Sequence, residues 1–301
     1  LQRRRQRQMC IRDRFIRPGM VRIFPLIFVL LWSSAFITTK PIIDNSDPFA
    51  ALAFRFFFVA VGFLLFSIYL KQSILIKKRY LIESMFSGIL FHGLYLGGVF
   101  YSISIGMPTS LAALIVTLQP ILTNILSGPL LNEKVTLQQW VGVLLGFVGA
   151  SLVLGIDVGS GIPLLGLIAT LIALLSITFS TIWQKKLSNN LPLSVSNFYQ
   201  ALGGCLFHVL IIIFFIEPYI YFTKTFIIAM SHQIFLVSFG AFTILMFLIK
   251  KNSASKTVSV FFLIPATSAI MAWLFLNETL TNIDVVGFLI ASVGVYIATR
   301  N

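Results

Sequence analysis

The sequence predicts an all-α polytopic membrane protein, with ten transmembrane helices arranged as two five-helix inverted repeats. Three observations lead to this fold class: an apolar composition, apolar runs long enough to span a bilayer, and a stretch of sequence that occurs twice. Of the 301 residues, 58% are hydrophobic and 10% are charged, and the mean hydropathy is +0.97. Such a chain has too few polar groups to cover a soluble globule of its size.

The apolar runs predict the ten helices. A run of roughly 20 apolar residues is able to cross a hydrocarbon core roughly 30 Å thick as a helix. The expected helices cover residues 22–40, 48–70, 80–104, 108–131, 136–156, 162–184, 193–216, 226–249, 255–277 and 282–299. Thr136 with Gln139, and Thr281 with Asp284, have the spacing of capping boxes and predict where the fifth and tenth helices start.

A stretch around the first of two mid-helix prolines recurs, without a gap, around the second. The matching pairs, 145 residues apart, are Pro120 and Pro265, Asn132-Glu133 and Asn277-Glu278, Thr136 and Thr281, Gly142 and Gly287, and Gly149 and Gly294. Equally spaced copies of this length indicate a duplicated unit, so we expect repeats at residues 20–156 and 157–301. Each repeat holds an odd number of helices, which makes the second copy enter the membrane from the opposite face, as in many secondary transporters.

The distribution of basic residues predicts the orientation. With the N-terminus inside, twelve Lys and Arg residues fall in the cytoplasm and only Lys40 and Lys224 fall outside. This bias follows the positive-inside rule and places both termini in the cytoplasm. Residues 1–19, with seven arginines and no initial methionine, differ from the rest of the chain. We expect this basic tail to be non-native or disordered, with the natural start at Met20.

Several local sequences resemble one family. They are LLWSSAFITTK in the first helix, Phe54-Arg55 opening the second, the two mid-helix prolines before an apolar run that ends in Asn-Glu, and the glycine-rich fifth and tenth helices. By these features the chain from Met20 to Asn301 resembles the EamA-type carriers of the drug/metabolite transporter superfamily. The resemblance implies a bacterial inner-membrane carrier that exports, or less often imports, small metabolites. It also implies a central cavity lined by helices one, three, four, six, eight and nine.

The two mid-helix prolines mark the expected substrate pathway. Each lacks an N–H and frees a backbone carbonyl, which in hydrocarbon must be satisfied by protein, water or ligand. A kink that only shapes packing is the alternative. With neighbouring polar groups and aromatic side chains, the expected pathway residues are Trp32, Phe36, Tyr95, Gln119, Pro120, Asn124, Trp183, Pro265, Thr267 and Ser268. Interhelical hydrogen bonding and ordinary packing are the structural alternatives for these side chains.

Three titratable residues lie inside apolar runs: Arg55, His92 and His208. An intramembrane charge requires a partner, so Arg55 either pairs with an acidic loop residue or a lipid phosphate, or attracts an anionic substrate group. The histidines are candidates for proton coupling, and neutral hydrogen-bonding groups are the alternative. Glu133 and Glu278 fall on opposite membrane faces and are expected to cap the helices that follow them.

The expected function is a secondary-active exporter of small organic metabolites, such as amino acids or related compounds, working by alternating access. Two alternatives stay open: a nucleotide-sugar or sugar-phosphate carrier, which would need several basic residues in its cavity, and a non-transporting membrane scaffold. The sequence holds no nucleophile–base motif and no P-loop, so we expect neither an enzyme nor a metal or cofactor. The expected partners are a small solute, the lipid bilayer and a proton or other coupling ion, with a homodimer left open. Nucleic acid is not expected, because the basic residues are spread between apolar runs.

Overall fold

The computed structural model describes residues 23–107, 109–155, 161–188, 190–276 and 281–300. The described residues form helices and connecting segments, with one isolated antiparallel bridge between Ser46 and Ile220 and no strand. Within these ranges, ten helices are long and apolar enough to cross a membrane, which confirms the predicted fold class. The basic tail at 1–19 and Glu278 lie outside the described residues.

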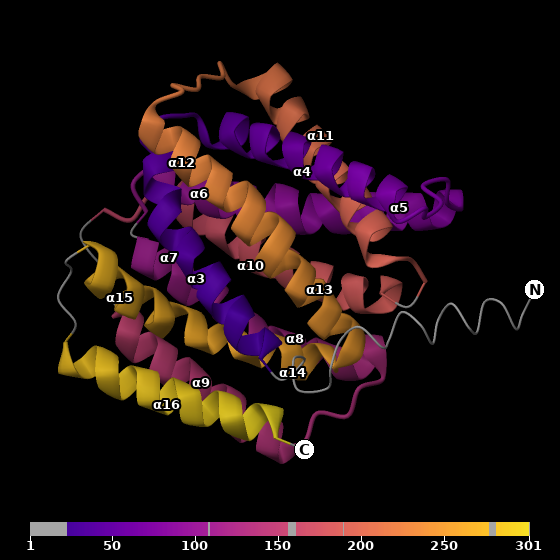
Figure 1. Ribbon diagram of the computed structural model, residues 1–301. Helices are drawn as coiled ribbons and strands as arrows, with labels where there is room; N and C mark the ends of the chain where they lie inside the picture. Colours follow the sequence, from indigo (N-terminus) through magenta and orange to yellow (C-terminus); the bar gives the residue numbers. More distant parts are fainter. Residues whose placement is uncertain (1–22, 108, 156–160, 189, 277–280, 301) are drawn as a thin grey trace, which may run out of the picture.

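The first repeat contains five spans (Figure 1). The first, second and fifth spans are single helices, α3 (Phe24–Ile43), α4 (Pro48–Tyr69) and α9 (Leu137–Leu154). The third span consists of α5 (Lys78–Gly88), η2 (Ile89–Tyr95) and α6 (Leu96–Ser104), and the fourth of α7 (Thr109–Val116) and α8 (Gln119–Leu131). In the second repeat the sixth, seventh and tenth spans are single helices, α10 (Leu164–Leu187), α11 (Leu193–Phe215) and α16 (Asn282–Thr299). The eighth span consists of α12 (Lys224–His232), η3 (Gln233–Ala241) and α13 (Phe242–Lys251), and the ninth of α14 (Ala254–Ser259), η4 (Val260–Phe262) and α15 (Leu263–Leu276).

Side chains cap the helices where the sequence predicts them to start. Thr136 and Gln139 form a capping box on α9, and Thr281 and Asp284 form one on α16. Each box satisfies backbone N–H groups that a helix start leaves without partners. Glu133 differs from the prediction. Its carboxylate accepts the backbone N–H of Ala254, at 3.0 and 3.1 Å from the two oxygens. It therefore adds to the Ser253 cap at the start of α14 in the other repeat, and the Thr136 box caps α9.

Both repeats interrupt their third and fourth spans at equivalent positions. The third and eighth spans contain the π-helical segments η2 and η3. The fourth span breaks at Thr117 and Leu118, immediately before α8, which begins with Gln119 and Pro120. The ninth span contains the 3₁₀ turn η4 shortly before Pro265. The prolines account for the second kind of interruption, because they remove an i→i−4 hydrogen bond. The π segments have no signal of that kind in the sequence.

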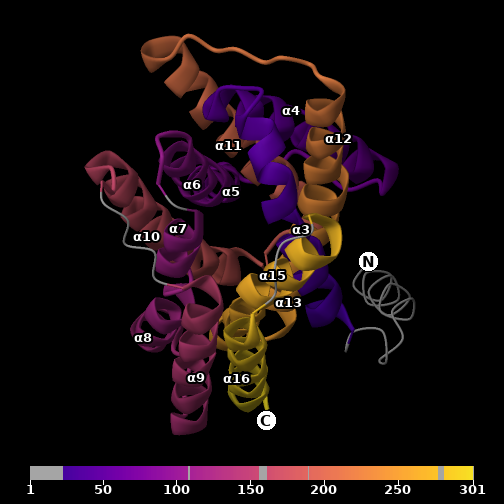
Figure 2. The ribbon, with the colours of Figure 1, turned by 90° about the vertical axis from the view of Figure 1, so that its left-hand side faces the viewer.

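The repeats are inverted about the contact between α9 and α16, which lie side by side in Figures 1 and 2. A Cβ atom added to Gly142 would collide with the backbone of Gly294 and Ala298, and one added to Gly149 with that of Gly287 and Ala291. The start of α9 therefore lies against the end of α16. Because these two helices are copies of each other, an antiparallel contact between them means that the repeats have opposite orientations.

Candidate functional site

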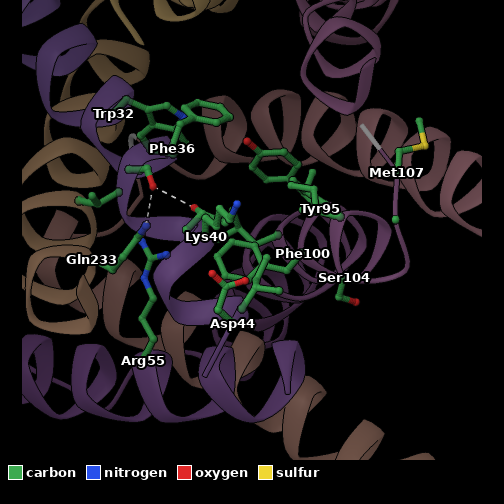
Figure 3. Close-up of a pocket in the computed structure, with 18 residues that line it drawn as sticks. Trp32, Phe36, Lys40, Asp44, Arg55, Tyr95, Phe100, Ser104, Met107 and Gln233 are labelled. Atoms are coloured by element: carbon green, nitrogen blue, oxygen red, sulfur yellow. Dashed lines mark hydrogen bonds between the residues drawn. The ribbon is translucent and has the colours of Figure 1, made fainter. Parts of the chain in front are cut away.

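A cavity of about 440 Å³ lies between α3, α4, the third span and η3 (Figure 3). Its floor is formed by buried residues, among them Trp32, Arg55 and Tyr95. Its rim includes Lys40, at the end of α3, and Ser104, at the end of α6, and both are exposed. The cavity therefore leads from the middle of the helix bundle to one end of it.

Aromatic rings close the cavity beyond its floor. The Trp32 ring packs against Phe28 at 5.3 Å, Phe261 at 5.9 Å and Phe91 at 6.0 Å between ring centroids. These three phenylalanines are at most 8% exposed. Close packing of this kind leaves no room for water or solute, so the cavity has no exit on the side where α3 begins.

Four of the residues singled out in the sequence line the cavity: Trp32, Phe36, Arg55 and Tyr95. The walls come from helices one, two, three and eight, and none of the eighteen lining residues comes from helices four, six or nine. The wall therefore differs from the set that the family resemblance implies. Both repeats contribute to this wall, the first through helices one, two and three and the second through helix eight.

The polar residues next to the two prolines hold helices together. Gln119 donates a hydrogen bond to Thr181 at 3.0 Å, Asn124 accepts one from Ser255, and Ser268 donates to the Ser33 carbonyl at 3.3 Å. The remaining pathway residues that do not line the cavity are Pro120, Pro265, Thr267 and Trp183, and the last packs edge-on against Phe86 at 5.5 Å. Their part in transport stays a prediction.

The two histidines lie together outside the cavity wall. His92 is 3% exposed and His208 is fully buried. A ring nitrogen of His208, Nε2, lies 2.9 Å from the His92 carbonyl, while both ring nitrogens of His92 make no hydrogen bond with a described residue. The His92 ring packs against Phe56 and Phe242 with centroids 4.3 and 4.6 Å apart. A role in proton coupling stays a prediction.

Arg55 extends from α4 toward the cavity (Figure 3). Its side chain is 5% exposed, its Nε donates to Ser238 Oγ at 2.9 Å, and its guanidinium carbon lies 5.3 Å from the centroid of the Phe56 ring. No carboxylate of a described residue lies within 4.0 Å of its guanidinium. The acidic loop partner considered for Arg55 is therefore not found among these residues.

Sequence reasoning missed five other polar residues of the cavity: Thr39, Lys40, Asp44, Ser104 and Gln233. Lys40 and Gln233 both line it, and Gln233, 1% exposed, donates from Nε2 to the carbonyl of Ala35 and the hydroxyl of Thr38, both at 2.9 Å. Lys40 had a usable signal, because it is one of two basic residues on the predicted outer side. Gln233 had a weaker one, as a polar residue inside an apolar run.

The end of the bundle opposite the cavity mouth is held closed by polar contacts. Phe24, at the start of α3, packs against Phe247 of α13 at 5.3 Å, which places the end of α13 at this end of the bundle. There Lys185 of α10 donates through Nζ to the backbone carbonyls of Ile249, at 2.9 Å, and Asn252. The Glu133 cap on α14 lies in the adjoining segment.

The described residues contain no group of three or more His, Cys, Asp or Glu side chains that could hold a metal ion. Cys205 is a buried free thiol. What the site offers is a partly apolar cavity with one buried cation, one exposed cation and a carboxylate at Asp44. Such a lining is suited to binding a small solute.

Comparison with known proteins gives consistent matches. The pattern of the EamA-like transporter family matches residues 20–155 and again 164–300. A Bacillus subtilis protein named as the uncharacterized transporter YvbV is 25% identical over 276 residues, which cover 87% of this chain and 86% of that protein. An Escherichia coli protein named as a probable amino-acid metabolite efflux pump is 22% identical, over 91% of this chain and 93% of its own length.

One solved crystal structure has the same fold. It superposes with a TM-score of 0.80 at 18% sequence identity and covers 94% of this chain and 97% of its own. At this identity the likeness concerns the arrangement of helices alone.

Proposed function

We propose that this chain, which belongs to the EamA-like transporter family of the drug/metabolite transporter superfamily, is a secondary-active exporter of small organic metabolites. The chain is an integral membrane protein with ten apolar helices in its described part. The proposal adds a substrate class, amino acids or related compounds, a mechanism of alternating access, and a place in the bacterial inner membrane with both termini in the cytoplasm. In this orientation the cavity faces outward.

The observation that carries the proposal is a cavity open at one end of an inverted repeat and closed at the other. In an inverted repeat, each half is able to take the conformation of the other half, which produces the same cavity on the opposite side. The equivalent of the open contact between α3 and α6 is the contact between α10 and α13. Lys185 closes the contact between α10 and α13, while the cavity lies between α3 and α6.

The repeat predicts which residues close the mouth. Lys40 is the counterpart of Lys185, and Ser104 and Met107 are the counterparts of Ile249 and Asn252, each 145 residues earlier. All three line the cavity, and the ammonium of Lys40 makes no hydrogen bond or ion pair with any described residue. When the protein switches, we expect Lys40 Nζ to donate to the carbonyls of Ser104 and Met107 while Lys185 releases its two carbonyls.

The amino-acid class is supported by the size and lining of the cavity and by the Escherichia coli relative, which is named as a probable amino-acid metabolite efflux pump. A volume of about 440 Å³ lies at the small end of the range for ligand pockets. A nucleotide sugar carries two phosphates and calls for several cations. The basic residues of this wall are Arg55 and Lys40, so a sugar-phosphate or nucleotide-sugar carrier is the weaker proposal.

The test is a comparison of metabolites in the medium and the cytosol between cells that overproduce the protein and cells that lack it. We expect at least one amino-acid-like metabolite to shift from cytosol to medium. Val99→Trp, which fills the cavity from α6, should abolish the shift at equal membrane levels. Leu144→Trp, at a position of α9 that is 52% exposed, is the matched control and should not. A protein that changes no metabolite, and moves none after reconstitution in vesicles, would instead be a scaffold.

A further inference from the structure

A buried arginine faces the cavity without a counter-ion. Arg55 is 5% exposed and lies in the cavity wall. Of its five N–H donors, the one on Nε donates to Ser238, and no carboxylate of the described residues lies within 4.0 Å. Removing a cation from water without an opposite charge is unfavourable. The remaining donors, which form the planar end of the guanidinium, are therefore available to a ligand.

The other charges around the cavity do not neutralise Arg55. Lys40 adds a second positive charge at the rim, and Asp44, also at the rim, makes no ion pair with either cation. His232, on the element next to η3, is engaged with the hydroxyls of Ser34 and Thr38 at 3.0 and 3.4 Å. The net charge of Arg55, Lys40 and Asp44 is positive, so an anionic group of a ligand is attracted to Arg55 at the floor of the cavity.

The rest of the wall restricts the class of anion. The aromatic side chains Trp32, Phe36, Tyr95 and Phe100 line the same cavity, so the part of the ligand away from Arg55 contacts mainly apolar surface. A guanidinium pairs with a carboxylate through two parallel hydrogen bonds. A phosphate monoester carries a charge of about −1.5 to −2 and has three acceptor oxygens. A single buried cation therefore matches the charge of one carboxylate better than that of a phosphate.

We infer that Arg55 binds the carboxylate of a small amphipathic solute whose apolar group packs on the aromatic side of the cavity. Ser238, through its hydrogen bond to Nε, is a positioning residue that orients the guanidinium. The inference rests on the proposed transport function and narrows its substrate class to monocarboxylates with an apolar or aromatic group.

The first experiment uses the unaltered binding site and four probes. Three of the four tryptophans, Trp140, Trp183 and Trp273, are replaced by phenylalanine, so that the fluorescence of Trp32 in the cavity wall reports binding. The purified full-length protein is titrated with 3-phenylpropionate, its methyl ester, L-phenylalanine and phenyl phosphate. We expect the two carboxylates to bind at least about tenfold more tightly than the ester. Equal binding of the ester, tighter binding of phenyl phosphate, or no carboxylate binding overturns the inference.

The second experiment assigns the preference to Arg55. Arg55→Met should remove the difference between acid and ester, Arg55→Lys should keep part of it, and Ser238→Ala should weaken acid binding without affecting the ester. Lys224→Met, which removes a cation on the same predicted side but outside the cavity, is the control and should change neither. If the acid preference survives Arg55→Met, the anion site lies elsewhere.

The outcomes separate this inference from the proposed function. Acid-selective binding without flux in reconstituted vesicles keeps the Arg55 site and removes the transporter proposal. Metabolite efflux that is unchanged in Arg55→Met keeps the transporter and removes the site.

Discussion

Replacing Lys185 by methionine should shift the protein from the conformation in which the described cavity is open toward one in which the opposite end of the bundle is open. Methionine keeps most of the aliphatic stem and removes the ammonium, which donates to the carbonyls of Ile249 and Asn252. A hydrogen bond to a charged group contributes roughly 1.5–3 kcal/mol. Since Lys185 is half-buried, we take about 2 kcal/mol for the pair rather than the full sum. In the proposed transport cycle these bonds exist in one conformation only, so the equilibrium should shift about 30-fold.

Two single-cysteine reporters, made after Cys10 and Cys205 are replaced by alanine, measure this shift. Ser104→Cys lies at the cavity rim, and Asn252→Cys lies at the closed end and keeps the backbone carbonyl that Lys185 uses. With a soluble thiol reagent on the purified protein, Lys185→Met should slow modification at 104 and speed it at 252. Lys40→Met should have the opposite effect. Lys186→Met removes the same charge from the exposed neighbouring position; if it changes the rates as much as Lys185→Met does, the proposed latch is refuted.

Three further predictions concern the caps, the helix contact and the histidines. Glu133→Ala removes the acceptor of the Ala254 N–H at the start of α14, while the Ser253 cap remains, and should lower stability by about 1 kcal/mol, measured as a lower thermal midpoint, whereas Glu133→Gln should recover part of the loss. Gly149→Val places a side chain against the backbone of α16 and should prevent folding to a monodisperse protein, while Gly128→Ala, where a Cβ has space, should be tolerated; equal yields would contradict the α9–α16 contact. His92→Gln should leave solute exchange intact and abolish uptake driven by a pH gradient if His92 couples protons, and retained gradient-driven uptake rules that role out.

The fold was largely predictable because the bilayer restricts it. Ten apolar runs must become helices, since lipid offers backbone groups no partner, and the gap-free match of Gly142 to Gly287 indicates a duplicated unit. The capping boxes at Thr136 and Thr281 placed the two helix starts correctly. The π-helical segments were not predicted, because no proline or other local sequence signal marks them.

The site was only partly predictable. The sequence pointed to Arg55 and the aromatic side chains, because charge and large rings inside apolar runs stand out. It also pointed to Gln119, Asn124 and Ser268, whose polar groups the fold uses between helices. Composition cannot tell these uses apart, because which half of a pseudo-symmetric bundle is open depends on the conformation.

The contact between α9 and α16 has a consequence for how such a chain could have arisen. The face that α9 presents, through Gly142 and Gly149, is met by the equivalent face of α16, through Gly287 and Gly294. A surface that fits its own copy is isologous. A single five-helix ancestor carrying it would already have been able to assemble with a second molecule inserted upside down, and gene fusion would then only have fixed a pairing that the surface itself specifies.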